Sequence, residues 1–288
     1  MTEDPFVAHR SLLFTVAYEM LGSAADAEDV LQESWLRWAG VDRAQVRDPR
    51  GYLVRTVTRQ ALNRLRALSR SREDYVGQWL PEPLLTSPDV AEDVELAENV
   101  SIAVLTVLET LAPTERAVFV LREVFDLPYG EIAEAVGKSA AAVRQIARRP
   151  REHVAARRPR VQVSRSEQQA VVERFLAALR TGHLQELMEV MAPDVVMIAD
   201  GGGFVAAAPA PVHGAGLVAP LLARASRVVA GFEATDVWLN GAPAGRLTFD
   251  GEPSAVSLSV ENGRITRIYV VRNPRKLTRL DEPSELTR

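Results

Sequence analysis

Residues 128–149, PYGEIAEAVGKSAAAVRQIARR, constrain the fold most strongly, because their pattern predicts two short helices joined by a tight turn. Gly137 suits the end of the first helix, since glycine tolerates the left-handed conformation of a helix C-cap, and Ser139 suits the N-cap of the second. Val143 and Ile146 then point inward. The outward side of the second helix carries Arg144, Gln145, Arg148 and Arg149. This layout indicates a helix-turn-helix, whose second helix enters the major groove of DNA and contacts bases and phosphates. An ordinary helical hairpin with a solvated basic face is the alternative that this stretch alone leaves open.

Charge is distributed unevenly along the chain, although the formal net charge of −4 is unusual for a nucleic-acid-binding protein. Residues 43–72 hold nine arginines and one acidic residue, and residues 138–160 hold eight basic residues and one acidic residue. Between these basic segments, residues 73–99 hold eight acidic residues and no basic one. Basic segments attract phosphate and release counterions on binding it. Two of them on either side of an acidic connector favour nucleic-acid binding over solvated helix faces.

The composition excludes several kinds of site. The chain has 288 residues, 47% of them hydrophobic, which is enough for two or three compact domains. It contains no cysteine, so disulfides, zinc–thiolate sites and cysteine nucleophiles are excluded. The four histidines lack the spacing of metal ligands, and we expect neither a metal nor another cofactor. We also expect a soluble cytoplasmic protein with no membrane contact, because neither a signal-peptide pattern nor an 18-residue apolar run is present.

Hydrophobic periodicity predicts helices over residues 6–21, 26–38, 49–66, 95–111 and 114–125, all before the helix-turn-helix. Pro150 lies in the second helix of that motif, and we expect it to kink or end the helix. The acidic connector contains the hexapeptide Trp79-Leu80-Pro81-Glu82-Pro83-Leu84. A bare spacer needs no tryptophan or leucine, whereas a segment that binds in a pocket does.

The pattern changes after residue 164. Two helices are expected, over residues 167–180 and 184–191, and strands are expected over residues 195–199, 237–240, 246–249, 254–260 and 264–272. The Asn262-Gly263 pair between the last two strands is a strong signal for a two-residue hairpin. Helices followed by an antiparallel sheet predict an α+β cone around a pocket.

Several of these segments resemble one protein family. Residues 26–37, DAEDVLQESWLR, closely resemble the polymerase-binding helix of bacterial extracytoplasmic-function sigma factors, and the basic segment 49–66 resembles their helix that reads the promoter −10 element. Residues 96–157 resemble their second domain, whose helix-turn-helix reads the −35 element. The WLPEPL hexapeptide, the Asp200-Gly201-Gly202-Gly203 run and the segment Asn273-Pro274-Arg275-Lys276-Leu277 resemble the subgroup with a fused SnoaL-like C-terminal domain.

The resemblance implies a multidomain protein with two all-α sigma domains, the second bearing the helix-turn-helix, followed by an α+β SnoaL/NTF2-like cone domain. The implied divisions are residues 1–72 (region 2), 73–95 (linker), 96–160 (region 4) and 165–288 (C-terminal domain). The implied partners are bacterial core RNA polymerase and promoter DNA. The function that follows is promoter recognition and initiation of transcription, controlled by the chain's own C-terminal domain.

The resemblance also assigns roles to single residues. The core-polymerase surface is expected at Asp29, Gln32, Glu33, Trp35 and Leu36. The −10 element is expected to contact Arg55, Arg59, Gln60, Asn63, Arg64 and Arg66, where Gln60 and Asn63 replace the asparagine and aspartate that the family usually carries. The −35 element is expected to contact Ser139, Arg144, Gln145, Arg148 and Arg149.

A regulatory contact is expected between the linker and the C-terminal domain. Its linker side comprises Trp79, Leu80, Pro81, Glu82 and Pro83. Its other side comprises Asp200, Gly201, Gly202, Gly203, Asn273, Pro274, Lys276 and Leu277. This contact would hold the two DNA-binding domains together, so that no separate anti-sigma factor is required. The sequence leaves open whether the C-terminal pocket binds an unidentified small ligand.

Two other classes of function stay open. One is a one-component transcription regulator, with a helix-turn-helix and a ligand pocket but no polymerase contact. The other is a SnoaL-type cyclase or isomerase with a DNA-binding arm, which would need a general acid or base in its pocket. Candidates by residue type are Asp194, Asp200, His213, Asp236 and Tyr269. Nothing in their spacing selects one of them, so we expect no catalytic residue and no enzyme.

Overall fold

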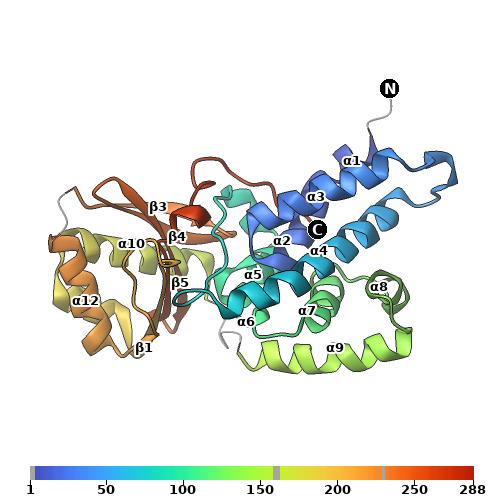
Figure 1. Ribbon diagram of the computed structural model, residues 1–288. Coiled ribbons are helices and arrows are strands. Elements are labelled where there is room, and N and C mark those ends of the chain that lie inside the picture. The colour runs from blue at the N-terminus through green and yellow to red at the C-terminus, as the bar shows by residue number, and fades with distance from the viewer. Residues whose placement is uncertain (1–3, 158–162, 229–230) are drawn as a thin grey trace.

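The computed structural model describes residues 4–157, 163–228 and 231–288. Among the described residues, helices dominate 4–157, and a six-stranded sheet with three α-helices follows. In Figure 1 the helical part and the sheet domain lie side by side, and the linker and the C-terminal segment run between them. The expected fold class, two all-α domains followed by an α+β domain, is confirmed.

The first domain consists of α1 (Pro5–Ala8), α2 (Arg10–Leu21), α3 (Ala24–Ala39), the 3-10 turn η1 (Arg43–Gln45) and α4 (Pro49–Glu73). Gly22 ends α2 in the left-handed conformation, with φ at 67°. The Ser23 side chain caps α3 by accepting from the Asp26 N–H at 3.2 Å, which satisfies one of the unpaired donors of the first turn. The basic helix α4 is longer than the sequence pattern predicted and runs on to Glu73.

The second domain consists of η2 (Pro88–Glu92), α5 (Val94–Val100), α6 (Ile102–Leu108), α7 (Pro113–Phe119), a π-helical turn η3 (Val120–Val124), α8 (Tyr129–Val136) and α9 (Ala140–Ala155). The expectation of one helix over residues 95–111 is wrong, because Ser101 adopts an extended conformation and caps α6 instead. Pro150 was expected to kink or end the second motif helix, and it does not end it. Pro150 is buried inside α9, which continues for five more residues.

The C-terminal domain contains α10 (Arg165–Thr181), α11 (Leu184–Val190), β1 (Met191–Asp200), β2 (Val212–His213), α12 (Ala215–Val228), β3 (Glu233–Leu239), β4 (Ala242–Phe249), β5 (Glu252–Glu261) and β6 (Arg264–Val271). A 3-10 turn, η4 (Pro274–Lys276), follows. The strand order is β2-β1-β6-β5-β4-β3, with β1 and β6 parallel and the other neighbours antiparallel. Helix α12 was not expected from the sequence.

The sheet is buried on both faces. On one face, Leu247, Val256 and other residues form a core with α10, α11 and α12. On the other face, Ala255 and Tyr269 pack with Leu80 of the linker and Ile102 of α6. Successive residues of a strand point to opposite faces of the sheet, so β5 and β6 contribute to both cores. The second core forms where the linker and the second domain cover the sheet.

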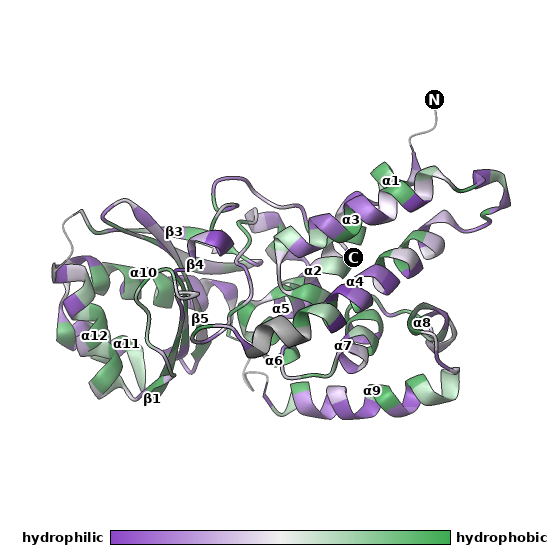
Figure 2. Ribbon diagram, viewed as in Figure 1, coloured by the Kyte–Doolittle hydropathy of each residue, from purple (hydrophilic) through white to green (hydrophobic). Residues whose placement is uncertain are grey.

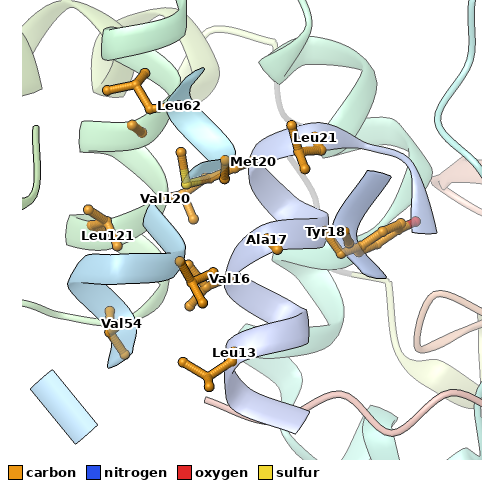
Figure 3. Close-up of a cluster of buried hydrophobic side chains, with 14 of the residues drawn as sticks. Leu13, Val16, Ala17, Tyr18, Met20, Leu21, Val54, Leu62, Val120 and Leu121 are labelled. Carbon is orange, nitrogen blue, oxygen red and sulfur yellow. The ribbon is translucent and has the colours of Figure 1, made fainter. Parts of the chain in front are cut away.

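The two helical domains also share a core. Figure 3 shows α2 and α4 side chains, including Val16, Met20 and Val54, packed with Val120 and Leu121 of η3. All five are at most 4% exposed. In Figure 2, α4 and α9 alternate between hydrophilic purple and hydrophobic green, as amphipathic helices that bury one side do. The three domains therefore form one packed body.

Candidate nucleic-acid interface and interdomain contacts

Helices α8 and α9 form the expected helix-turn-helix. Gly137 joins them with φ at 69°, and Ser139 Oγ accepts from the Ala142 N–H at 3.2 Å to cap α9. Val143 is fully buried and Ile146 is half-buried against the core. The exposed side chains on this motif include Ser139, Arg144, Gln145, Arg148 and Arg149. The motif thus presents the expected basic surface to solvent.

Two arginines on that surface are held by acidic neighbours. Arg148 donates to Glu152 at 2.9 Å, and this hydrogen bond raises the pKa of Arg148. Arg149 pairs with Glu115 of α7 at 3.1 Å. Both pairs are solvated on the arginine side, so they hold the side chains weakly and DNA phosphate can compete for them.

The basic side of α4 lies against α8 of the second domain. Arg59 donates to the Glu134 carbonyl oxygen at 2.8 Å, and Arg55 lies 3.7 Å from the Glu134 carboxylate. Gln60 is only 9% exposed and donates to Glu33 at 3.2 Å. Asn63 and Arg66 are exposed. The segment expected to contact the −10 element is therefore partly covered by the helix-turn-helix domain.

Arg64 joins α4 to α3. It pairs with Asp26 at 2.6 Å and with Asp29 at 3.3 Å. The hydrogen bond to Asp26 is the main reason why the pKa of Arg64 is raised. Arg64, which is expected to contact DNA, is thus ion-paired with Asp29, which is expected to contact polymerase.

The outer face of α3 combines acidic and apolar groups. Asp29, Gln32, Glu33, Trp35 and Leu36 are all exposed there. Leu36 is 67% exposed, and the Trp35 ring meets the Phe6 ring edge-on at 5.2 Å. A groove of about 420 Å³ runs along this face between α1 and α3. Exposed leucine and tryptophan beside carboxylates suit a partner with basic and apolar groups.

The linker meets the C-terminal domain at Asp200, the last residue of β1. Asp200 has no exposed surface, and its carboxylate accepts from Tyr75 Oη at 2.7 Å, from the Leu80 N–H at 2.9 Å and from Lys276 Nζ at 2.7 Å. Lys276 also donates to the Leu80 carbonyl oxygen and lies 4.0 Å from the centroid of the Trp79 ring. A buried carboxylate is stable only when it is paired and hydrogen-bonded, as it is here.

The other residues around Asp200 pack closely. Asn273 Nδ2 donates to Tyr75 Oη at 2.8 Å, and burial is the main reason why the pKa of Tyr75 is raised. Gly202 has φ at 60°, and a Cβ there would collide with Asn273 and Tyr75. Gly201 approaches the Val205 backbone equally closely. Pro274 begins η4, and Leu277 is buried against the core that contains Leu80.

Glu82 connects the linker to the first domain. Its carboxylate is 2% exposed and accepts from the Ala24 N–H at 2.7 Å and from Ser23 Oγ at 3.3 Å, at the start of α3. The Glu82 N–H donates to the Gly22 carbonyl oxygen at 2.8 Å. The neighbouring Pro81 and Pro83 are buried. The hexapeptide therefore contacts the first domain and the C-terminal domain at once.

Sequence reasoning missed several contacts. Asn240, at the turn between β3 and β4, bonds to Tyr18, to Leu84 and to the Val100 carbonyl oxygen. The only sequence signal was the Asn240-Gly241 pair, which predicts a hairpin but no partner. Arg116 of α7, 1% exposed, donates to the Glu19 carbonyl oxygen at 3.1 Å and pairs with Glu109. Nothing in its sequence context marked it.

The C-terminal segment was also not expected to contact the first domain. Leu286 is buried in the core of the helical domains, and the Thr287 N–H donates to Thr15 Oγ1 at 3.0 Å. Arg288 pairs with Asp93 at 2.7 Å. In Figure 1 this end of the chain lies beside α2 and α4.

The candidate catalytic residues do not gather at one site. Asp194, Asp236 and His213 are exposed, and His213 lies in β2 rather than in a loop. Tyr269 is buried with its pKa raised by burial, on the sheet face that packs against the linker. Over the described ranges, no group of His, Cys, Asp and Glu side chains is arranged to hold a metal ion. None of the described helices has the length and hydrophobicity that a membrane crossing requires.

Comparisons with known proteins agree with this architecture. The family described as Sigma-70 region 2 matches residues 6–71, and the family described as Sigma-70, region 4 matches residues 101–154. The extracytoplasmic-function (ECF) RNA polymerase sigma factor SigJ of Mycobacterium tuberculosis is 35% identical over an alignment of 293 positions, gaps included, that covers 96% of this chain and 94% of SigJ. The probable ECF sigma factor SigI of the same species is 33% identical, over 94% of this chain and 92% of SigI.

The solved structures include a full-length match. The crystal structure of Mycobacterium tuberculosis SigJ superimposes with a TM-score of 0.73 and 33% sequence identity, covering 95% of this chain and 97% of that one. The similarity extends through the C-terminal domain and is not limited to the two sigma regions. The chain therefore belongs to the extracytoplasmic-function RNA polymerase sigma factors, which bind core RNA polymerase and promoter DNA to initiate transcription.

Proposed function

We propose that the C-terminal domain of this sigma factor holds the two sigma domains closed, and that promoter recognition requires the closed arrangement to open. The observation that carries the proposal is the Asp200 contact, in which a fully buried carboxylate of the C-terminal domain binds Tyr75 and Leu80 of the linker. Because the restraint comes from the same chain, no separate anti-sigma factor is required.

The closed arrangement would act first on the −10 element. Arg55 and Arg59 are engaged by Glu134, and Gln60 by Glu33. We assign these α4 side chains, together with Asn63, Arg64 and Arg66, to the melted −10 strand, where arginines hold the backbone and amides read an unstacked base. A DNA strand can reach Arg55 and Arg59 only after α8 has moved away from α4.

Two surfaces would remain available in the closed state. We assign core-polymerase binding to Asp29, Gln32, Glu33, Trp35 and Leu36, and −35 binding to Ser139, Arg144, Gln145, Arg148 and Arg149. All ten residues are exposed. Polymerase can therefore bind α3 before the domains separate. The acidic linker would then leave the sheet and follow a polymerase channel for nucleic acid, where its carboxylates replace phosphates.

The C-terminal domain would act by binding rather than by catalysis, because its candidate acid–base residues Asp194, His213 and Asp236 are exposed, whereas Asp200 and Tyr269 are buried. Binding of a small ligand inside the cone would be transmitted to the linker through β1. The β1 residues Val195, Met197 and Ala199 line the core of the cone, and Asp200 follows directly. A ligand that shifts β1 would therefore move the carboxylate that holds the linker.

The test is promoter-dependent initiation by core RNA polymerase with the full-length chain. Asp200→Asn removes the charge that Lys276 pairs with, and we expect more initiation than with the unchanged chain at sub-saturating sigma factor. Asp236→Asn, an exposed substitution in the same domain, is the matched control and should change nothing. Equal initiation by both variants and the unchanged chain would contradict control by this contact.

A further inference from the structure

The turn between β3 and β4 reaches from the C-terminal domain to the place where the linker and both sigma domains meet. Asn240 is 1% exposed at this turn. Its Nδ2 donates to Tyr18 Oη at 2.6 Å and to the Val100 carbonyl oxygen at 2.9 Å. Its Oδ1 accepts from the Leu84 N–H at 3.0 Å. One amide thus bonds to α2, to the end of α5 and to the linker.

The backbone of the turn adds to these bonds. Asn240 has φ at 53°, in the left-handed region that asparagine tolerates better than most residues. Its N–H donates to the Leu84 carbonyl oxygen at 2.9 Å, and the Gly241 N–H donates to Thr86 Oγ1 at 3.0 Å. A Cβ on Gly241 would lie 2.9 Å from that of Ala97, so the turn is packed tightly against α5.

Each side-chain donor of Asn240 and Tyr18 has an acceptor. Tyr18 Oη donates to the Glu82 carbonyl oxygen at 2.7 Å, which leaves its lone pairs for Asn240. Burial is the main reason why the pKa of Tyr18 is raised, so the phenol stays protonated and can donate. Both amide protons and the amide oxygen of Asn240 have partners. If one partner left, a buried polar group would lose its bond, which is costly.

We propose that Asn240 makes the closed arrangement cooperative, so that region 2, the linker and region 4 are held together or released together. This inference rests on the proposed closing role of the C-terminal domain and names the residue that couples the three segments. Displacement of Leu84 of the linker from Asn240 would then loosen the contacts of Asn240 with Tyr18 and Val100 at the same time. A signal that breaks any one contact would free both sigma domains.

Asn240→Asp tests the coupling with little change in shape. The carboxylate keeps an acceptor for Leu84 and tolerates the left-handed conformation, but it cannot donate to Tyr18 or Val100. Asn262→Asp is the matched control, because Asn262 occupies the same position of the β5–β6 hairpin with φ at 52° and is exposed. Asn240→Gly removes the amide while keeping the turn, and carries the test if the aspartate variant does not fold.

The measurement is hydrogen–deuterium exchange of the full-length chain, followed in peptides that cover residues 12–21, 74–87 and 94–101. We expect Asn240→Asp to raise exchange about tenfold or more in all three peptides together, and Asn262→Asp to leave them unchanged. Tyr18→Phe should produce the same three-part increase, and the double variant should add little to either single one, because the contacts act as one unit.

An increase confined to the peptide around one contact, or none at all, would overturn the coupling. Asp200→Asn measured in parallel separates the two claims. If Asp200→Asn raises exchange in the linker and Asn240→Asp does not, the coupling role of Asn240 is wrong while the closing role of the C-terminal domain stands. If neither variant changes exchange, both are wrong.

Discussion

At the scale of single residues, the helix-turn-helix contains two glycines with opposite requirements. Gly137 has φ at 69° with open space around its Cα, so alanine there meets only backbone strain. We expect Gly137→Ala to destabilise the protein by about 1 kcal/mol. Gly130 lies inside α8 with open space around it, and Gly130→Ala should stabilise by about 0.5 kcal/mol through the unfolded chain. Urea unfolding followed by circular dichroism measures the free energy of unfolding of both variants. Changes of the same sign in the two variants would contradict the different roles given to the two glycines.

Glu82 gives a prediction about pH. Burial is the largest influence on its carboxyl group and raises the pKa above its ordinary value of 4.5. A carboxyl group with a raised folded pKa contributes stability that is full below pH 4.5 and is lost as the pH rises through the folded pKa. Glu82→Gln removes this loss. We therefore expect the free energy of unfolding to depend less on pH as the pH rises above 4.5.

The measurement for Glu82 is urea unfolding at several pH values, with tryptophan fluorescence as the signal. Glu252→Gln, at an exposed position of β5, is the control and should reproduce the pH dependence of the unchanged chain. If Glu82→Gln and Glu252→Gln gave identical pH profiles, the carboxyl group of Glu82 would not be the source of the dependence.

Which residues could be predicted depended on whether they stood in a recognisable motif. Trp79, Asp200 and Lys276 could be named because each belongs to a short segment with a family resemblance, and the structure brings the three together. Asn240 and Arg116 could not. An Asn-Gly turn predicts a hairpin wherever it occurs, and only the packing of the three domains distinguishes the buried Asn240 from the exposed Asn262.

At the scale of single elements, α9 should contact DNA phosphates. Each lost phosphate contact lowers the slope of log K against log salt by about 1. We expect Arg144→Ala to reduce the salt dependence of −35 binding in the polymerase complex by about that amount. Arg224→Ala, an exposed arginine of α12, should leave it unchanged. Fluorescence anisotropy with labelled promoter DNA at several salt concentrations measures the slopes, and equal slopes for both variants would contradict the role of α9.

The outer face of α3 should bind core polymerase. Leu36 and Leu217 are each 67% exposed, on α3 and on α12 respectively, and form a matched pair. A buried charge in an interface costs much more than a solvated one. We expect Leu36→Asp to weaken binding of core polymerase about tenfold or more, and Leu217→Asp to have no effect. Biolayer interferometry with immobilised polymerase measures the affinity of each variant. Equal affinities of the two variants would contradict the role of this face.

Periodicity predicted the helices better than their ends. The apolar spacing located α2, α3, α4 and α10, but residues 95–111 divide at Ser101, where the side chain caps a new helix. Pro150 was expected to kink or end α9, but α9 continues to Ala155 with Pro150 buried inside it. Helix α12 was missed because its alanines and Pro220 resemble a loop in composition, although buried Ala215, Val218 and Ala219 follow helical spacing.

At the scale of the whole molecule, the three domains bury surfaces that none could bury alone. Val120 and Leu121 of the second domain pack into the α2–α4 core, and Leu80 of the linker covers the outer face of the sheet. The fold class followed from the order of helices and strands along the chain. The closed arrangement could not be read from that order, because it depends on which apolar surfaces meet once the domains have formed.

The most direct test of the closed arrangement is energy transfer between dyes on the two sigma domains of the full-length chain. The protein contains no cysteine, so Ala44→Cys and Lys138→Cys, both at exposed positions, label region 2 and region 4 uniquely. We predict a single state in the free protein, and a fall in transfer efficiency on Asp200→Asn substitution and on addition of core polymerase. If Asp200→Asn left the efficiency unchanged, the C-terminal domain would not be what holds the sigma domains together.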